Sequence, residues 1–131
     1  MTWLLDTSTI VAALRGHVEV RRRLAAASPD DLTVPSVAVA ELVYGAERST
    51  DPMRARLVWR EFVEPYVVVP FDRAAAEQHG RLRFALRAQP IGERDLLIAA
   101  TALAHGLTVV TGNTREFGRV PGLAVQDWIG G

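Results

Sequence analysis

The architecture of this chain is organised around residues 90–104, which read Pro90-Ile91-Gly92-Glu93-Arg94-Asp95-Leu96-Leu97-Ile98-Ala99-Ala100-Thr101-Ala102-Leu103-Ala104. From Leu96 onward every residue of this stretch except Thr101 is apolar, which predicts a helix that is buried on nearly all sides. The proline and glycine at its start end the preceding element, so Asp95 falls at the N-cap or in the first turn, where its charge suits the helix dipole. Asp95 is therefore either a helix cap or a carboxylate placed for chemistry.

A second acid, Asp6, follows the short apolar segment 1–5, which has the length and flanks of a buried strand. The next residues, Thr7-Ser8-Thr9, predict a strand-to-helix turn in which any of the three caps a helix over 10–15 that stops at Gly16. Asp6 then stands at the carboxyl end of the first strand, the edge where open α/β sheets build their sites. A turn or capping role is the alternative.

A third acid, Glu41, lies on a helix predicted from Ser36 to about Glu47. The residues three and four positions away from it are apolar or small: Val37, Ala38, Tyr44 and Gly45. A carboxylate on an apolar face needs compensation because its unpaired burial is costly. We therefore expect a cation, a network of donors or a raised pKa at Glu41. The alternative is a boundary glutamate that reaches water along its own stem.

The composition narrows the chemistry. With 131 residues and a hydrophobic fraction of 49% the chain is expected to form a single domain, residues 1–131, around a real core. The absence of cysteine leaves oxygen and histidine as metal ligands, which favours Mg²⁺ or Mn²⁺. A formal net charge of +0 means that any contact with nucleic acid is local. All 15 basic residues are arginine, which excludes mechanisms that need a lysine.

Neither a long apolar run nor the beginning of a secretion signal is visible in the sequence. We expect a soluble, unexported protein of the cytoplasm, without a membrane partner.

Apolar, β-branched segments alternate with helical ones along the chain. Strands are predicted at 2–5, 32–34, 66–71, 107–111 and, at an edge, 123–128. Helices are predicted at 18–27, 36–47, 53–64, 73–88 and 95–105. The alternation indicates an α/β fold with a mostly parallel sheet of four or five strands and helices on both faces.

Such a sheet gathers its strand ends at one edge. Asp6 and the polar turn at 112–116 leave two of these ends, and Glu41 and Asp95 are carried by helices that can face the same crevice. Several carboxylates cannot share a small volume without compensation. A divalent cation relieves the repulsion, and its bound water supplies a nucleophile for phosphodiester hydrolysis.

Two arginines, Arg83 and Arg87, lie one turn apart on the 73–88 helix, with Arg81 nearby. They precede the Asp95 segment directly. The pair is interpreted as an RNA-binding surface that contacts the phosphate backbone, with a solvated helix face as the alternative.

Four segments resemble, in order and spacing, the motifs of the PIN-domain ribonucleases, and the VapC toxin branch is the most similar. They are Leu4-Leu5-Asp6-Thr7, Ala40-Glu41-Leu42-Val43-Tyr44-Gly45, Gly92-Glu93-Arg94-Asp95-Leu96-Leu97-Ile98-Ala99-Ala100 and Val110-Thr111-Gly112-Asn113-Thr114-Arg115-Glu116-Phe117. The resemblance extends over essentially the whole chain.

This resemblance implies a three-layer α/β/α PIN fold and an Mg²⁺- or Mn²⁺-dependent endoribonuclease that cuts with water and leaves a 5′-phosphate. It also implies a toxin neutralised by a cognate VapB-type antitoxin, and a homodimer. Carried over by position, Asp6, Glu41 and Asp95 are the catalytic, metal-holding acids. Thr7 and Ser8 match positions that orient the first acid.

The chain departs from the family pattern at two positions. The family commonly has asparagine two residues after the first aspartate, where this chain has Ser8, and that change predicts a less firmly oriented site. Many relatives place a fourth aspartate near position 113, where this chain has Asn113, followed a turn later by Glu116. Asn113 can ligate a metal through its carbonyl oxygen, and Glu116 can do so directly or through water. Fewer charges predict a lower metal affinity.

Three other classes of protein are alternatives. The first is a catalytically silent PIN-like module that binds RNA or protein. The second is a phospho-accepting α/β domain, which is disfavoured by the absence of lysine and by Ser8 standing where an acid is needed. The third is a purely structural partner protein. The histidines are expected to have no catalytic role, and the RNA target, whether tRNA, rRNA or mRNA, stays open.

Overall fold

The computed structural model describes residues 1–130 and contains one sheet of five parallel strands. The strands are β1 (Trp3–Leu5), β2 (Leu32–Pro35), β3 (Val67–Val69), β4 (Thr108–Val110) and β5 (Val125–Gln126). Their order across the sheet is β3-β2-β1-β4-β5, so the first strand is central and the last is an edge strand. The prediction of a mainly parallel α/β sheet is confirmed.

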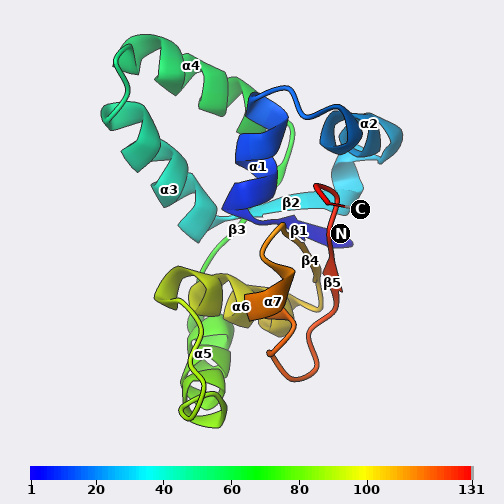
Figure 1. Ribbon diagram of the computed structural model, residues 1–131, viewed down its shortest axis with the longest axis vertical. Coiled ribbons are helices and arrows are strands. Elements are labelled where there is room, and N and C mark those ends of the chain that lie inside the picture. The colour runs from blue at the N-terminus through cyan, green and yellow to red at the C-terminus, as the bar shows by residue number, and fades with distance from the viewer. Residues whose placement is uncertain (131) are drawn as a thin grey trace.

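Helices cover both faces of the sheet and complete three layers (Figure 1). They are α1 (Thr7–Leu14), α2 (Val18–Ala26), α3 (Ser36–Glu47), α4 (Pro52–Val63), α5 (Arg73–Ala85), α6 (Glu93–His105) and α7 (Thr114–Phe117), with a short 3₁₀ helix at Pro29–Asp31. The first four lie on one side of the sheet, and α5, α6 and α7 lie on the other (Figure 1). Within residues 1–130, every helix is too short or too polar to cross a membrane.

Neighbouring strand residues point to opposite faces and build two cores. Leu4 and Val109 pack with Ile98 of α6 on one face. Leu5 and Val110 pack with the α1 and α3 helices on the other face. A strand that is apolar at consecutive positions is therefore explained by burial on both sides.

The helix α6 is the most buried of the molecule, as its composition predicts. Leu96, Ile98, Ala99, Ala100 and Ala102 are buried. The single polar residue in its centre is Thr101, whose hydroxyl donates a hydrogen bond to the carbonyl of Leu97 at 2.8 Å. This side-chain hydroxyl is therefore not left unpaired. The helix ends at Gly106, whose φ of +66° is the left-handed conformation that glycine adopts without strain.

Some predicted boundaries were wrong. The prediction that Thr7, Ser8 or Thr9 caps the first helix fails because Asp6 itself is the N-cap, and α1 begins at Thr7. The predicted strand 66–71 is paired only at Val67–Val69. The predicted helix 73–88 ends at Ala85, and the polar turn after β4 contains the short helix α7.

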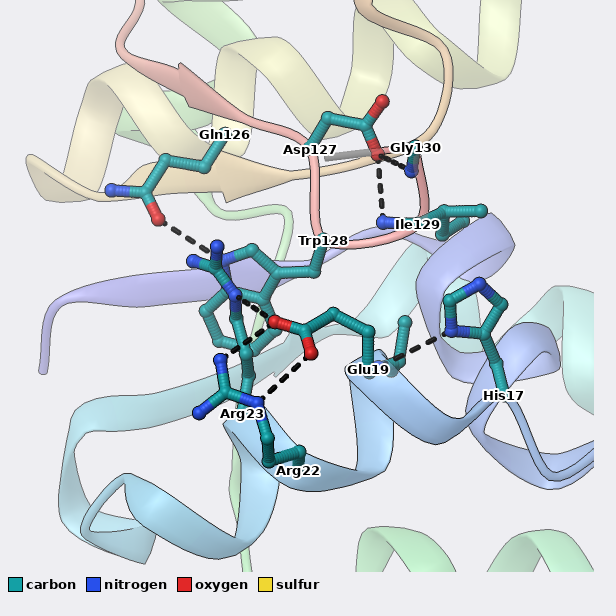
Figure 2. A network of polar contacts seen from close by, with 10 residues as sticks. His17, Glu19, Arg22, Arg23, Gln126, Asp127, Trp128, Ile129 and Gly130 are labelled. Carbon is teal, nitrogen blue, oxygen red and sulfur yellow. Dashed lines mark hydrogen bonds and ion pairs between the residues drawn. The ribbon is translucent and has the colours of Figure 1, made fainter.

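The C-terminal residues are fastened to the sheet by Trp128 (Figure 2). Its indole is 2% exposed, stands edge-on to Trp3 at 5.5 Å between ring centroids, and donates to the side-chain oxygen of Gln126 at 3.0 Å. The guanidinium of Arg23 lies 5.8 Å from the same ring. Trp128 therefore anchors residues 127–130 to the core.

Asp127 turns the chain back toward the end of β4. Its Oδ1 accepts hydrogen bonds from the backbone of Ile129 and Gly130 (Figure 2). This turn places the Ile129 side chain so close to Gly112 that a Cβ at position 112 would lie 2.9 Å from Cδ1 of Ile129. Gly112 thus lets the C-terminal turn pack against the polar turn that leaves β4.

Candidate carboxylate site at the carboxyl edge of the sheet

Asp6 leaves the end of the central strand and is 4% exposed. Its Oδ1 accepts from the backbone N–H of Thr7 at 2.8 Å, which caps α1. Its Oδ2 accepts from the hydroxyls of Ser8 at 3.0 Å and Thr111 at 2.7 Å. Asp6 is thus both a cap and a firmly oriented buried carboxylate, so the two interpretations of this residue do not exclude each other.

Thr111 joins the ends of the two central strands. It follows β4, which pairs with β1 through Leu5 and Val110, and its side chain is fully buried. The hydroxyl donates to Asp6 and accepts from the backbone N–H of Asn113 at 2.9 Å. Sequence reasoning assigned Thr111 only to a strand. The signal for its role is a polar residue at the carboxyl end of an otherwise apolar strand.

Ser8 supports the same edge from the α1 side. Its hydroxyl donates to Asp6 and accepts from the backbone N–H of Gly112 at 3.1 Å. Thr7 contributes its backbone N–H, whereas its hydroxyl is buried without a hydrogen-bond partner. The structure therefore brings both predicted supporting residues beside Asp6, one through its side chain and one through its backbone.

Asp95 lies in the first turn of α6, as predicted. The N-cap of that helix is Gly92, and the Asp95 carboxylate turns instead to Asn113, whose amide donates to Oδ2 at 2.7 Å. Burial and, after it, the negative charges of Asp6 and Glu116 raise the pKa of Asp95 to about 6. The Asn113 hydrogen bond and the Arg94 charge oppose this increase only in part. Asp6 and Glu116 therefore lie near enough for their charges to act on Asp95.

Glu116 of α7 fixes the beginning of α6. Its Oε2 accepts from the backbone N–H of Gly92 at 2.9 Å, and its Oε1 lies 3.5 Å from Nη2 of Arg119. Because an N–H at the start of α6 is satisfied by Glu116, the nearby Asp95 is not needed as the cap.

Glu41 has the cationic partner that its setting predicts. Nη1 of Arg94 donates to Oε2 of Glu41 at 2.5 Å, which joins α3 to the first turn of α6. The face around Glu41 is only partly buried, because Tyr44 is 62% exposed. The Glu41 side chain is 19% exposed, so it lies at the boundary of the core.

The residues at this edge fit a divalent cation. Within residues 1–130, no three carboxylate or imidazole side chains already converge on one point as metal ligands. Mg²⁺ needs no such cluster, since proteins usually bind it through one or two carboxylates and leave water and substrate phosphate as the other ligands. Asp6 and Asp95 provide two carboxylates, and a cation would offset both the burial and the neighbouring negative charges that raise the pKa of Asp95.

The two arginines predicted to bind RNA lie elsewhere. Arg83 and Arg87 stand at the end of α5, where they line a cavity of about 490 Å³ with Gly80, Phe84 and Pro90. The guanidinium of Arg87 lies 4.0 Å from the centroid of the Phe84 ring, and that ring is 66% exposed. The structure does not bring this pair into contact with the acids.

The histidines take other contacts. Nδ1 of His17 accepts from the backbone of Val20 and caps α2 (Figure 2), His79 stands edge-on to Phe71, and His105 lies 3.1 Å from Asp72.

Comparison with known proteins assigns this fold and site. Residues 3–123 match the family described as the PIN domain. The "tRNA(fMet)-specific endonuclease VapC" proteins of Salmonella typhimurium and Shigella flexneri are 35% and 37% identical to the chain, each over 98% of both sequences. The solved structure of DNA-bound VapBC from Salmonella typhimurium aligns over 98% of both chains with a TM-score of 0.93 and 34% identity.

This chain, a parallel α/β/α domain with a carboxylate at the end of its central strand, is thus a PIN domain. The chain belongs to the VapC ribonucleases, the toxin branch of the PIN-domain family. The resemblance inferred from the four sequence motifs is confirmed, and so is the expected three-layer fold.

Proposed function

We propose that this chain is the toxin of a type II toxin–antitoxin pair and hydrolyses RNA as an Mg²⁺- or Mn²⁺-dependent endoribonuclease. Residues 1–131 act as a single PIN domain, and the cytoplasm, where RNA substrates are present, is the compartment of this activity. The observation that carries the proposal is the placement of buried Asp6 near Asp95, whose pKa is raised by burial and then by the negative charges of Asp6 and Glu116.

Asp6 and Asp95 are the two acids proposed to hold the cation. Asp6 is oriented by three donors, and Asp95 by one. Asn113 has its amide on Asp95, which leaves its carbonyl oxygen to act as a further ligand. Glu41 and Glu116 lie farther out and supply further negative charge, and each would ligate the cation either directly through its carboxylate or through a bridging water. Ser8 and Thr111 keep the first acid in place.

A bound cation would lower the pKa of water and neutralise charge on the scissile phosphate. One of the acids at this edge would orient the attacking water and accept its proton. The water oxygen forms a bond to phosphorus while the bond from phosphorus to the 3′ oxygen breaks. The 3′ oxygen takes up a proton, so the products carry a 3′-hydroxyl and a 5′-phosphate.

Transfer RNA is the first substrate class to examine. Two relatives that share more than a third of their residues with this chain are named for cleavage of tRNA(fMet). The proposed contacts outside the acids are Arg83 and Arg87, which have no carboxylate partner among the ion pairs of residues 1–130. Unpaired arginines remain available to phosphates.

A VapB-type antitoxin is the proposed protein partner, since similar chains were solved as VapBC complexes. The surface assigned to it is a groove of about 850 Å³ between α1, α3 and α4. Its lining combines the apolar side chains of Val11, Leu14 and Val58 with arginines such as Arg48 and Arg54. This lining suits a segment with an apolar face and acidic residues. A homodimer is proposed by the same family relationship.

The test is incubation of the purified, antitoxin-free protein with total cellular RNA in Mg²⁺ or Mn²⁺, with EDTA in a parallel reaction. Asp95→Asn keeps the shape of the side chain and removes its charge, so it is the matched inactive variant. Discrete products with 5′-phosphate ends, lost in EDTA and in the variant, are the expected result. A folded protein that binds RNA and leaves it intact in every metal would instead be a silent PIN-like binding module.

A further inference from the structure

Arg94 is a charged residue of the site to which the proposed mechanism assigns no role. It directly precedes Asp95 on α6, and its side chain is 71% exposed. Its guanidinium nevertheless reaches across to α3 and donates to Glu41, which is far more buried. Glu41 is therefore held at the edge of the core, while the Arg94 guanidinium reaches it from the solvent side.

The same guanidinium also acts on the neighbouring acid. The charge of Arg94 is among the influences that keep the pKa of Asp95 from being higher. One positive charge thus stands beside both Glu41 and Asp95. A divalent cation held by Asp6 and Asp95 would draw on Glu41 as an outer acid, directly or through water, and the carboxylate of Glu41 cannot pair fully with both this cation and Arg94.

We propose that Arg94 is the resident counter-ion of Glu41 in the metal-free protein and competes with the divalent cation for this acid. The inference rests on the proposed metal-dependent function. Loss of the ion pair is inexpensive, because an arginine that is mostly in solvent gives up little packing when it moves. Arg94 thereby sets how tightly the site holds its metal.

The displaced guanidinium remains at the α1–α3–α4 groove proposed above for the antitoxin. Arg94 and Glu41 both line the α1–α3–α4 groove, which Arg15, Arg48 and Arg54 also line. When Glu41 turns to the metal, Arg94 is free to pair with a phosphate of RNA at the mouth of this groove. Metal binding would thus release Arg94 from its ion pair with Glu41 and leave its positive charge free for the substrate.

The experiment is calorimetric titration of Mn²⁺ into the metal-free protein at fixed pH and ionic strength. Arg94→Gln removes the competing charge, and we expect its Mn²⁺ affinity to rise by up to about fivefold, the upper end of what an exposed ion pair supplies. Arg94→Lys restores a positive charge and should return the affinity to within about twofold of the wild type. The matched control is Arg56→Gln, because Arg56 pairs with Glu47 at 2.8 Å on the far end of the same helix, α3. This control should bind Mn²⁺ as the wild type does.

The outcomes separate this inference from the proposed function. A wild type that binds Mn²⁺ together with an Arg94→Gln variant of equal or lower affinity would overturn the counter-ion role alone. A wild type that binds no Mn²⁺ would overturn both. Thermal unfolding of each variant without metal confirms that the compared proteins are folded.

Discussion

The side-chain amide of Asn113 donates a hydrogen bond of 2.7 Å to Oδ2 of Asp95. Many relatives carry a fourth acid at the position of Asn113. In this chain the position therefore holds a donor that stabilises the ionised form of Asp95. This exchange lowers the negative charge of the site while keeping Asp95 oriented.

Replacing Asn113 by aspartate should increase the negative charge of the site and remove the hydrogen bond to Asp95. The change removes a donor and adds a charge, so it raises the pKa of Asp95 further and destabilises the metal-free protein at pH 8 by about 1 kcal/mol. With more charge to hold the cation, Mn²⁺ affinity should increase several-fold. Asn113→Ala, which loses the donor without adding charge, should bind Mn²⁺ more weakly than wild type. Calorimetry on both variants checks the pair, and an Asn113→Asp variant that binds no more tightly than Asn113→Ala would refute the assignment.

Stability should depend on the ionisation of Asp95. Its pKa in the folded protein, about 6, lies above its ordinary value of 3.8, so protonated Asp95 favours the folded state. That contribution is complete below about pH 4 and is lost as the pH rises through about 6. Since the group is half-exposed, the loss should amount to about 1 kcal/mol.

The comparison is urea unfolding of metal-free wild type and Asp95→Asn at pH 4.5 and pH 7.5. The variant should lack this part of the pH dependence and should be the more stable of the two at pH 7.5. Parallel pH profiles for the two proteins would mean that Asp95 is not under charge repulsion in solution.

The hydroxyl of Thr111 should matter for both stability and cleavage. Thr111→Val keeps the volume but leaves the N–H of Asn113 unpaired and Asp6 short of one donor, which should cost about 1–2 kcal/mol. Looser orientation of Asp6 should lower the RNA cleavage rate about 10- to 100-fold. Thr111→Ser retains the hydroxyl and should recover most of the rate. If valine and serine variants cleave equally well, Thr111 has only a packing role.

The end of α5 should contribute to RNA affinity. Arg83→Ala and Arg87→Ala should each weaken binding and reduce the slope of log affinity against log salt by about 1. Arg73→Ala is the matched control, since Arg73 lies on the same helix and its side chain is 92% exposed. Filter binding over a salt series measures both quantities. Slopes that match the control would assign the two arginines to a solvated face.

The central acids were predictable because each one interrupts an apolar segment. Asp6 ends a strand that is buried on both faces, and Asp95 opens the most buried helix, so the fold places both at the carboxyl edge of the sheet. The parallel direction of the strands also followed from the alternation of strands and helices, whereas their order across the sheet did not. These features depend on local pattern and are visible in one sequence.

The partners of the acids were not predictable in the same way. Arg94 pairs with Glu41 across 53 positions, and Thr111 bonds Asp6 across 105. Such contacts depend on how α3 meets α6 and how β4 lies beside β1, which local periodicity does not encode. The cap of α1 was misassigned for a related reason, because the side chain of Asp6 serves the helix and the site at once.

The most direct test of the proposed centre is X-ray diffraction from crystals grown with Mn²⁺, with anomalous data to locate the ion. The account predicts a Mn²⁺ peak at about 2.1–2.2 Å from carboxylate oxygens of both Asp6 and Asp95, with water completing its coordination. The peak should be absent from crystals of Asp95→Asn. Anomalous density that avoids both carboxylates, in a protein that cleaves RNA, would contradict the claim that these two acids hold the catalytic cation.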